Sequence, residues 1–510
     1  MGMGMQRMDS ELKKEFNKKS VYGKLFMIEG CILLIPCILL IFYPDERREA
    51  FCFLIPGALS IVFGFLLMKF SLAFKTKKEA PSRQLRYHSS EIVLTAWVYG
   101  FLLGAIPFLL LGNYNPVQAI FEAVSGFTTT GLSVMRVDEA SHLFLFYRSF
   151  IQFVGGLGFI LMMMIFLQEK QEADLYNAEG HPDRIKPSPG KTARAIFGMY
   201  SGFLLAGTAS YMLFGMDLFE SVNHAMCALS TGGFSTRVDS IAEYNSLGVE
   251  AVTIALMLIG TTNFAVLLLL VKGKVKQAGK VSEVKFMGLL LALSIPLTAV
   301  ILYHGLYGIS SESIRQAIFN VVSALSTTGF ATCSYADWPS AALFVMILLM
   351  LIGGGIGSTA GGIKMSRVYL GLRGLKSYVG SRLGARHEIK APYYYKAQGK
   401  TEIDQNLLED TFFFIGAYLI IYVLGTMGIC ISESCTLQEA MFEFASALGT
   451  VGLSIGITGP ETGNMTLIIE IIGMFMGRLE IFAVITGIYA VFVRIKGRIK
   501  GKKSRFQSGY

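Results

Sequence analysis

Four short stretches of this chain combine threonine or serine hydroxyls with glycine-containing backbone, and each has a threonine two residues before its last glycine. The stretches recur about every hundred residues, which marks an internal repeat. Hydroxyl and main-chain carbonyl oxygens are neutral ligands that suit an alkali cation. The candidate ligands are Thr128, Thr129, Thr130 and Gly131; Ser230, Thr231, Gly232 and Gly233; Ser326, Thr327, Thr328 and Gly329; and Gly449, Thr450, Val451 and Gly452.

The sequence around each stretch predicts how the oxygens are presented. A short apolar segment of the length expected for a re-entrant half-helix precedes every stretch. The negative end of each half-helix dipole would then point at the loop and favour a cation. A polar residue recurs at the same position of each segment. It would serve either as a structural anchor or as part of a cation-attracting vestibule. These residues are Glu122, His224, Asn320 and Glu443.

A second glycine-rich segment interrupts an apolar run of the third repeat. A continuous helix would lose roughly 1 kcal/mol per glycine, so we expect a broken helix or loop near the ion path. Close packing of helices on small residues is the alternative. A phosphate-binding loop is excluded because a long membrane run precedes the segment. The candidate gating residues are Gly353, Gly354, Gly355, Gly357, Ser358, Thr359, Gly361 and Gly362.

Arg478 lies in the last apolar run. A charged side chain at mid-membrane costs at least ~2.5–3.5 kcal/mol, which makes it a functional candidate. Below a cation-binding ring its guanidinium would delay a departing cation. A structural ion pair with Glu470 or Glu480 is the other interpretation.

Apolar runs supply the elements that position these residues. The pattern predicts ten membrane-spanning helices and four half-helices. A helix pair precedes the repeats, and each repeat is a helix, a half-helix, a loop and a helix. The predicted spans are 22–43, 51–74, 89–111, 143–168, 193–216, 247–271, 284–305, 341–372, 409–432 and 463–495, and the half-helices are 116–126, 218–229, 313–325 and 437–448.

Composition supports a membrane protein and argues against other classes. Of 510 residues, 53% are hydrophobic and 16% are charged, against roughly 25% charged in soluble domains. The net charge of +9 arises from basic connectors, which the positive-inside rule explains without nucleic acid. The same rule places both termini in the cytoplasm and the four loops toward the outside. No catalytic set and no zinc motif is present, and the seven cysteines leave open only a Cys333–Cys435 pair.

These features together resemble a known family. Thr450-Val451-Gly452 matches the core of the potassium-channel filter signature, and the fourfold chain is similar to the superfamily of Trk, Ktr and plant HKT potassium transporters. The extra helix pair resembles the bacterial TrkH type of potassium-uptake subunit. Glycine at the last filter position of every repeat, here including Gly131, implies potassium selectivity in that superfamily.

The resemblance implies a fold and partners. The fold class is an all-α polytopic membrane protein with four repeats around a pseudo-fourfold pore. It implies a multi-pass protein of the cell membrane, a homodimer in membrane lipid, and a cytosolic nucleotide-binding regulatory ring, with potassium as the transported ion and no cofactor in this chain. The units are 1–88 (arm and helix pair), 89–192, 193–282, 283–407 and 408–510 (pore repeats one to four).

Other functions stay open at this point. A sodium or non-selective cation transporter would have the same architecture. A membrane-embedded transferase would not explain four matched loops, and a sodium-coupled carrier typically has two inverted repeats. Channel-like and proton-coupled transport are not distinguished.

Overall fold

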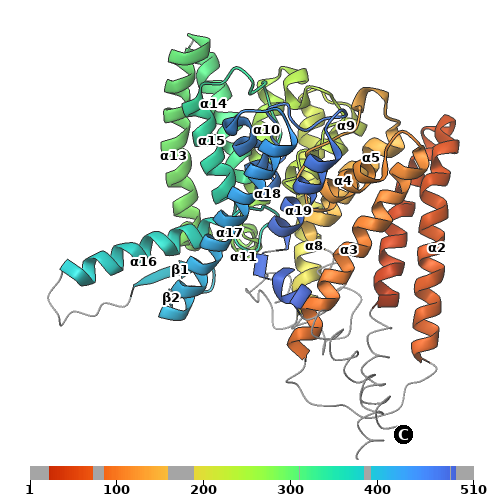
Figure 1. The fold of residues 1–510 in the computed structure, drawn as a ribbon, viewed down its shortest axis with the longest axis horizontal. Coiled ribbons are helices and arrows are strands. Elements are labelled where there is room, and N and C mark those ends of the chain that lie inside the picture. Colours follow the sequence, from red (N-terminus) through yellow and green to blue (C-terminus); the bar gives the residue numbers. More distant parts are fainter. Residues whose placement is uncertain are drawn as a thin grey trace, which may run out of the picture.

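The computed structural model describes residues 22–72, 85–158, 189–308, 310–383, 392–479, 481–482 and 484–489. These residues form a helical bundle with one small β-hairpin (Figure 1). Two helices precede the repeats: the segment Tyr22–Ile41, whose last part is the 3-10 helix η1 (Ile35–Ile41), and α2 (Arg47–Leu72), with η2 (Pro44–Glu46) between them. Gly23 packs against the backbone of Gly64, and Gly30 against that of Gly57, so the two helices approach closely.

The same order of elements then recurs four times. A first long helix, a short helix and a further helix follow one another in each repeat. In chain order they are α3 (Leu85–Leu111), α4 (Pro116–Phe127) and α5 (His142–Leu157); α8 (Pro189–Leu213), α9 (Leu218–Leu229), α10 (Leu247–Thr261) and α11 (Phe264–Val271); α13 (Ser282–Leu302), α14 (Ser310–Ser326), α15 (Ser340–Ile352) and α16 (Met365–Leu383); and α17 (Gln405–Ser432), α18 (Leu437–Gly449) and α19 (Asn464–Arg478).

The short helices match the predicted half-helices within three residues at each end. Local capping explains why they begin where they do. Asn115 accepts hydrogen bonds from the backbone at the start of α4, Asp217 does so for α9, and Thr436 forms a capping box with Glu439 at the start of α18. Small elements fill the connections: η4 (Val137–Glu139), η5 (Ser240–Tyr244), α12 (Val275–Ala278) and the π-helical turn η6 (Tyr303–Tyr307).

The short helices α4, α9, α14 and α18 also determine how the repeats meet. Each short helix packs against the first helix of its own repeat and against the second helix of the preceding repeat. The contacts between neighbours are α5 with α9, α10 with α14, α15 with α18, and α19 with α4. The last contact joins the fourth repeat to the first, so the series closes into a cycle.

The second helices differ from the continuous spans that we predicted. Residues 247–271 form α10 and α11, which are bent by 115° at Thr262 and Asn263, because the Asn263 side chain caps a new helix there. The break predicted at 353–362 is present between α15 and α16. α5 ends at Leu157 and α19 at Arg478. Of the remaining predicted lengths, 159–168, 480, 483 and 490–495 lie outside the described residues, whereas 481–482 and 484–489 are described and helical. Within the described residues, six helices are long and apolar enough to cross a membrane, or seven counting the bent pair.

One local feature departs from the all-helical prediction. Strands β1 (Tyr393–Lys396) and β2 (Gly399–Glu402) form an antiparallel hairpin, with Tyr393 opposite Glu402. The backbone N–H of Tyr395 donates to the Ser282 hydroxyl at 3.0 Å, which ties the hairpin to the start of α13. The hairpin and α16 extend to one side of the bundle (Figure 1).

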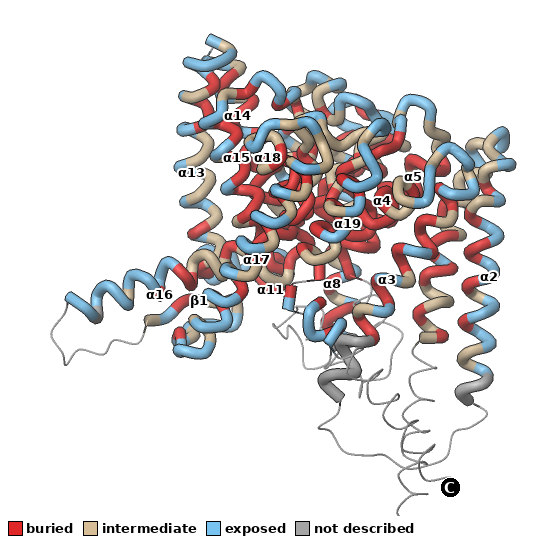
Figure 2. Tube along the Cα trace, viewed as in Figure 1, coloured by how far each residue is buried: buried red, intermediate tan, exposed pale blue. Residues whose placement is uncertain are grey.

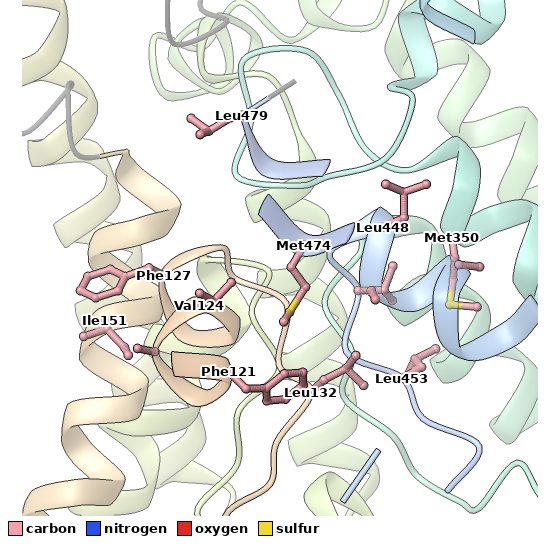
Figure 3. Close-up of a cluster of buried hydrophobic side chains, with 14 of the residues drawn as sticks. Phe121, Val124, Phe127, Leu132, Ile151, Met350, Leu448, Leu453, Met474 and Leu479 are labelled. Atoms are coloured by element: carbon pink, nitrogen blue, oxygen red, sulfur yellow. The ribbon is translucent and has the colours of Figure 1, made fainter. Parts of the chain in front are cut away.

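The buried core lies at the centre of the cycle of short helices, whereas the outer faces of α2 and α13 are largely exposed and apolar, as expected for helices in lipid (Figure 2). Figure 3 shows Met474 of α19 between Val124 of α4 and Leu448 of α18. All three side chains are buried, so apolar packing joins the fourth repeat to the first.

Candidate cation-binding ring

The threonine that recurs in each stretch adopts the same unusual backbone conformation. Thr129, Thr231, Thr327 and Thr450 have φ values of 56°, 53°, 55° and 50°. Left-handed backbone costs a β-branched residue on the order of 1–3 kcal/mol, and surrounding contacts must hold it. Four matched occurrences in one chain therefore indicate that the same structural constraint acts on each loop.

The last glycine of each stretch lies against the neighbouring stretch. Each has a positive φ, and a Cβ added to any of them would overlap a carbonyl oxygen of the next loop. The contacts run from Gly131 to Gly232, from Gly233 to Thr328, from Gly329 to Val451, and from Gly452 to Thr130. The fourth contact returns to the first loop, so the four stretches form a closed ring around one centre. We call this set of loops the ring.

The two ends of the ring differ in exposure. The four last glycines are partly exposed, whereas the threonines two residues earlier are buried. We call the glycine end the outer end and the threonine end the inner end. All sixteen residues proposed from sequence as ligands belong to the ring.

Hydrogen bonds from the short helices hold the loops. In every repeat, the residue six positions before the last glycine accepts the N–H of the residue just before that glycine. In repeat one the carbonyl of Ser125 accepts from Thr130 at 2.9 Å, its hydroxyl accepts from Gly131 at 3.1 Å, and the hydroxyl donates to the carbonyl of Leu132 at 2.5 Å. The equivalent residues are Ser125, Cys227, Ser323 and Ser446.

The four recurrent polar residues are anchors, as the first of our two interpretations held. Glu122 accepts from the hydroxyl of Ser133, and Glu443 accepts from that of Ser454 at 2.7 Å. His224 Nε2 lies 3.0 Å from the Ser235 hydroxyl. The fourth, Asn320, bonds Thr332 and Tyr335. Each therefore links a short helix to the chain just past its own ring segment.

The Glu122 anchor also carries a buried ion pair. Arg148 Nε of α5 lies 2.7 Å from Glu122, and both side chains are almost fully buried. The Arg148 guanidinium donates to the Ser133 hydroxyl at 2.7 Å and stacks 4.0 Å from the centre of the Phe234 ring. The positive charge of Arg148 is thus paired with the Glu122 carboxylate next to the ring. Through Phe234 the same side chain connects repeat one to repeat two.

The glycine-rich segment Gly353–Gly362 crosses the inner end of the ring. The N–H of Gly361 donates to the Thr327 hydroxyl at 2.8 Å, and the hydroxyls of Thr359 and Thr231 are 3.1 Å apart. A Cβ on Gly361 would overlap Thr450 and the Gly449 carbonyl. We call this segment the inner loop. It contacts ring residues of repeats two, three and four.

The remaining residues predicted for gating build the inner loop rather than contact the ring. Gly353 and Gly362 have positive φ and pack on each other, so both must be glycine. Gly354 donates to the carbonyl of Gly361, and the Ser358 hydroxyl donates to that of Gly355 at 2.7 Å. The N–H of Gly355 donates to the Thr261 carbonyl, and the carbonyl of Gly357 accepts from Phe264, so the bend between α10 and α11 supports the loop.

Arg478 binds the inner loop through carbonyl oxygens. Its Nη1 donates to the carbonyl of Thr359 at 2.6 Å. Its Nη2 donates to the carbonyls of Gly155 and Gly156 at the end of α5, the second of these at 3.3 Å. Glu470 instead accepts from the Thr458 hydroxyl at 2.8 Å, so the contacts of Arg478 correct the ion-pair interpretation with that residue; Glu480 lies outside the described residues.

Sequence reasoning missed three kinds of supporting residue. Gln152, a polar residue in the otherwise apolar α5, donates to the Gly232 carbonyl at 2.6 Å and accepts from the N–H of Phe234. Asn263 caps α11 and donates to the carbonyl of Ile356 at 2.5 Å. The glycines Gly155, Gly260 and Gly477 lie against the last carbonyls of their own short helices, where any side chain would clash. The signal available in the sequence for these three was a glycine in the helix that follows the ring segment.

Neither a metal-binding cluster nor a disulfide is present among the described residues. No group of three or more His, Cys, Asp or Glu side chains suited to a metal ion occurs among them. Cys333 and Cys435, whose pairing the sequence left open, are both free thiols. The residues of the ring are threonine, serine, glycine and valine, so the oxygens that they carry are neutral.

Comparison with known proteins identifies the family of this chain. The profile of the family described as "TrkH: Cation transport protein" matches residues 60–491. An uncharacterized cation transporter of Methanocaldococcus jannaschii is 28% identical over 481 residues, covering 91% of this chain and 93% of its own. The Trk system potassium uptake protein TrkH of Escherichia coli K12 is 29% identical over 486 residues, covering 91% of this chain and 96% of its own.

A solved structure extends the likeness to three dimensions. The crystal structure of the potassium transporter TrkH from Vibrio parahaemolyticus superposes with a TM-score of 0.78 at 25% identity, covering 92% of this chain and 97% of that one. The matched profile spans most of the chain, and the helices suit a multi-pass membrane protein. This chain belongs to the TrkH family of cation transport proteins.

Proposed function

We propose that this protein takes up potassium across the cell membrane through the ring formed by its four Thr-x-Gly loops, which acts as a selectivity filter at the centre of four pseudo-fourfold repeats. The closed cycle of glycine–carbonyl contacts, from Gly131 around to Gly452, carries the proposal. Carbonyl oxygens held around a single centre can replace the water shell of a dehydrated monovalent cation. The ends of four short helices at the ring favour positive charge there.

Potassium is the ion that the ligand chemistry favours. The residues of the ring carry no charge, and neutral oxygens compensate dehydration more readily for potassium than for sodium, whose water is held more tightly. Relatives with 29% identity are named as potassium uptake proteins. A sodium-transporting or non-selective ring is the second candidate, because a small change in ring diameter would alter the relative affinity for potassium and sodium.

The inner loop and Arg478 form the proposed gate. The loop crosses the inner end of the ring, and Arg478 holds it to the end of α5 through Thr359 and Gly155. A fixed positive charge at this level also opposes a cation leaving the ring. Conduction therefore requires the loop to move and the guanidinium to release its carbonyl partners.

Orientation and partners follow as further proposals. Exposed lysines lie between α11 and α13, on the side that we assign to the cytoplasm: Lys272, Lys274, Lys276 and Lys280. Both termini would then be cytoplasmic. This face is suited to a cytosolic nucleotide-binding regulatory ring, and the exposed apolar faces are suited to lipid and to a second copy of the chain in a homodimer.

Reconstitution tests the proposal. Purified protein in liposomes should take up rubidium, a potassium substitute, without any organic solute, and external potassium should inhibit this uptake far more than sodium does. Gly329→Ala places a Cβ against the Val451 carbonyl and should abolish most of the uptake. Gly288→Ala is the matched control, because nothing lies within 4 Å of the added Cβ.

Two outcomes would count against the proposal. Equal inhibition by sodium and potassium would favour the non-selective alternative. Unchanged uptake in Gly329→Ala would separate transport from the ring.

A further inference from the structure

The four ring threonines are not equivalent at the inner end. The hydroxyl of Thr327 accepts the Gly361 N–H, and that of Thr231 is within hydrogen-bond distance of the Thr359 hydroxyl. The hydroxyls of Thr129 and Thr450 are buried and have no hydrogen-bond partner. Two of four matched oxygens are therefore held by the inner loop, and two are available.

A threonine hydroxyl has one hydrogen to donate and two lone pairs to accept. At Thr231 the hydroxyl donates to the Ser230 carbonyl at 2.7 Å, so in its contact with Thr359 it can only accept the single Thr359 hydrogen, which the Gly260 carbonyl at 2.9 Å can also accept. At Thr327 the Gly361 N–H likewise uses a lone pair. A cation at the inner end of the ring would draw on the remaining lone pair of the same oxygens, and its positive charge would repel the donor hydrogens of the loop.

We propose that the inner loop and the transported cation compete for the hydroxyl oxygens of Thr231 and Thr327, so that potassium itself favours displacement of the loop. This inference rests on the proposed function and adds to it that the transported ion itself regulates the proposed gate. A ligand that binds one of two states shifts the population toward it by its differential affinity. Potassium at the inner end is that ligand here, and the open loop is the favoured state.

We call the contacts of the inner loop with the Thr231 and Thr327 hydroxyls the latch. Thr359 is the residue through which this latch can be weakened without replacing a residue of the ring. Its hydroxyl lies 2.9 Å from the Gly260 carbonyl and 3.3 Å from that of Leu229, besides the Thr231 contact. Valine has nearly the same shape but no hydroxyl. Thr359→Val leaves every ring residue in place and removes one side of the latch.

The exchange of backbone hydrogen in the inner loop measures the latch directly. Full-length protein in lipid nanodiscs is compared in potassium chloride and in N-methyl-D-glucamine chloride at equal ionic strength. In the wild type, potassium should speed exchange in peptides covering 353–364, because the Gly361 N–H loses its partner. Thr359→Val should raise the potassium-free rate about fivefold, the factor for ~1 kcal/mol per lost hydrogen bond, and should reduce the further effect of potassium.

Two controls separate the latch from general loosening. Thr359→Ser keeps the hydroxyl and should behave as the wild type does. Thr411→Val makes the same chemical change at a buried threonine of α17 whose hydroxyl donates to the Leu407 carbonyl, and should leave loop exchange unchanged. Exchange in α9 should stay slow in all variants.

The proposal is overturned if potassium slows loop exchange or leaves it unchanged, or if Thr359→Val exchanges no faster than the wild type. Rubidium uptake by the same wild-type preparation in liposomes identifies which idea has failed. Uptake together with either of these results removes only the competition, whereas absence of uptake removes the proposed function.

Discussion

Left-handed threonines at the ring carry a backbone strain that neighbouring groups must offset. Each of Thr129, Thr231, Thr327 and Thr450 donates its own N–H to a carbonyl three residues earlier, in the last turn of its short helix. The next residue donates to the carbonyl five residues before it, which is one position before the first acceptor. This pair of bonds closes the helix and fixes the turn into the ring, so strain is confined to one residue per loop.

Gly131→Ser should reduce the preference for potassium over sodium. The added Cβ meets the Gly232 carbonyl, and serine at a φ of 98° is strained, so the ring must widen or shift at that point. We expect roughly a tenfold loss of selectivity, equivalent to ~1.4 kcal/mol. Competition of sodium and potassium against rubidium uptake measures it, and unchanged selectivity would contradict the carbonyl-ring explanation.

Arg478→Ala should raise potassium flux. The change removes both the positive charge and the hydrogen bonds that hold Thr359 to the end of α5. Arg478→Lys keeps the charge but not the fork of donors, so flux in that variant should be intermediate. Uptake per amount of protein in the membrane is the measurement, and lower uptake in the alanine variant would indicate a purely structural role.

At the scale of elements, each short helix is both a support for its ring segment and a contact for the repeat before it. The anchors Glu122, His224, Asn320 and Glu443 bind the chain beyond the ring, so both ends of each loop are attached to one helix. The second helices end or bend where glycines pass the short helices. A rigid ring beside interrupted helices would let the proposed gate move without reshaping the proposed filter.

Arg148→Met should destabilise the fold, because it leaves the Glu122 carboxylate buried without its partner. Breaking a buried pair in this way costs about 3–5 kcal/mol. Arg136→Met is the matched control, since Arg136 pairs with Glu139 and Glu461 at the surface, where such pairs contribute about 0–1 kcal/mol. Thermal unfolding in detergent should separate the two variants, and similar melting temperatures would show that the buried pair contributes little.

At the scale of the whole molecule, one chain closes a cycle of four repeats. The contact of α19 with α4 completes it, and apolar side chains such as Met474 fill that junction. Polar and strained groups lie inside the cycle and apolar faces lie outside it, an arrangement that would suit the proposed pore in lipid.

Orientation can be tested by labelling introduced cysteines. Glu461→Cys, in the exposed loop between α18 and α19, should react with a membrane-impermeant maleimide added to intact cells. Lys274→Cys, between α11 and α12, should react only after the cells are permeabilised. Wild-type protein with its seven native cysteines sets the background. The reverse pattern would invert the assigned topology.

The sequence by itself determined the membrane environment, the four Thr-x-Gly loops, the four short helices and the break at Gly353–Gly362. These are local properties: the length of an apolar run, a cap, or a repeated motif can be recognised within a few residues. The hairpin at 393–402 and the bend at Asn263 were missed, because the hairpin is tied to Ser282 and the bend to Ile356, both distant in sequence.

Only the tertiary structure decided how the motifs meet. It brought Gly452 against Thr130, placed the inner loop on Thr231 and Thr327, and gave Arg478 carbonyl partners 119 and 323 residues away in the chain. A charged residue in an apolar run indicates that a partner must exist, but not which one, because the partner depends on how the repeats pack around a common centre. Packing between distant segments, which no local pattern records, turned four similar loops into one ring.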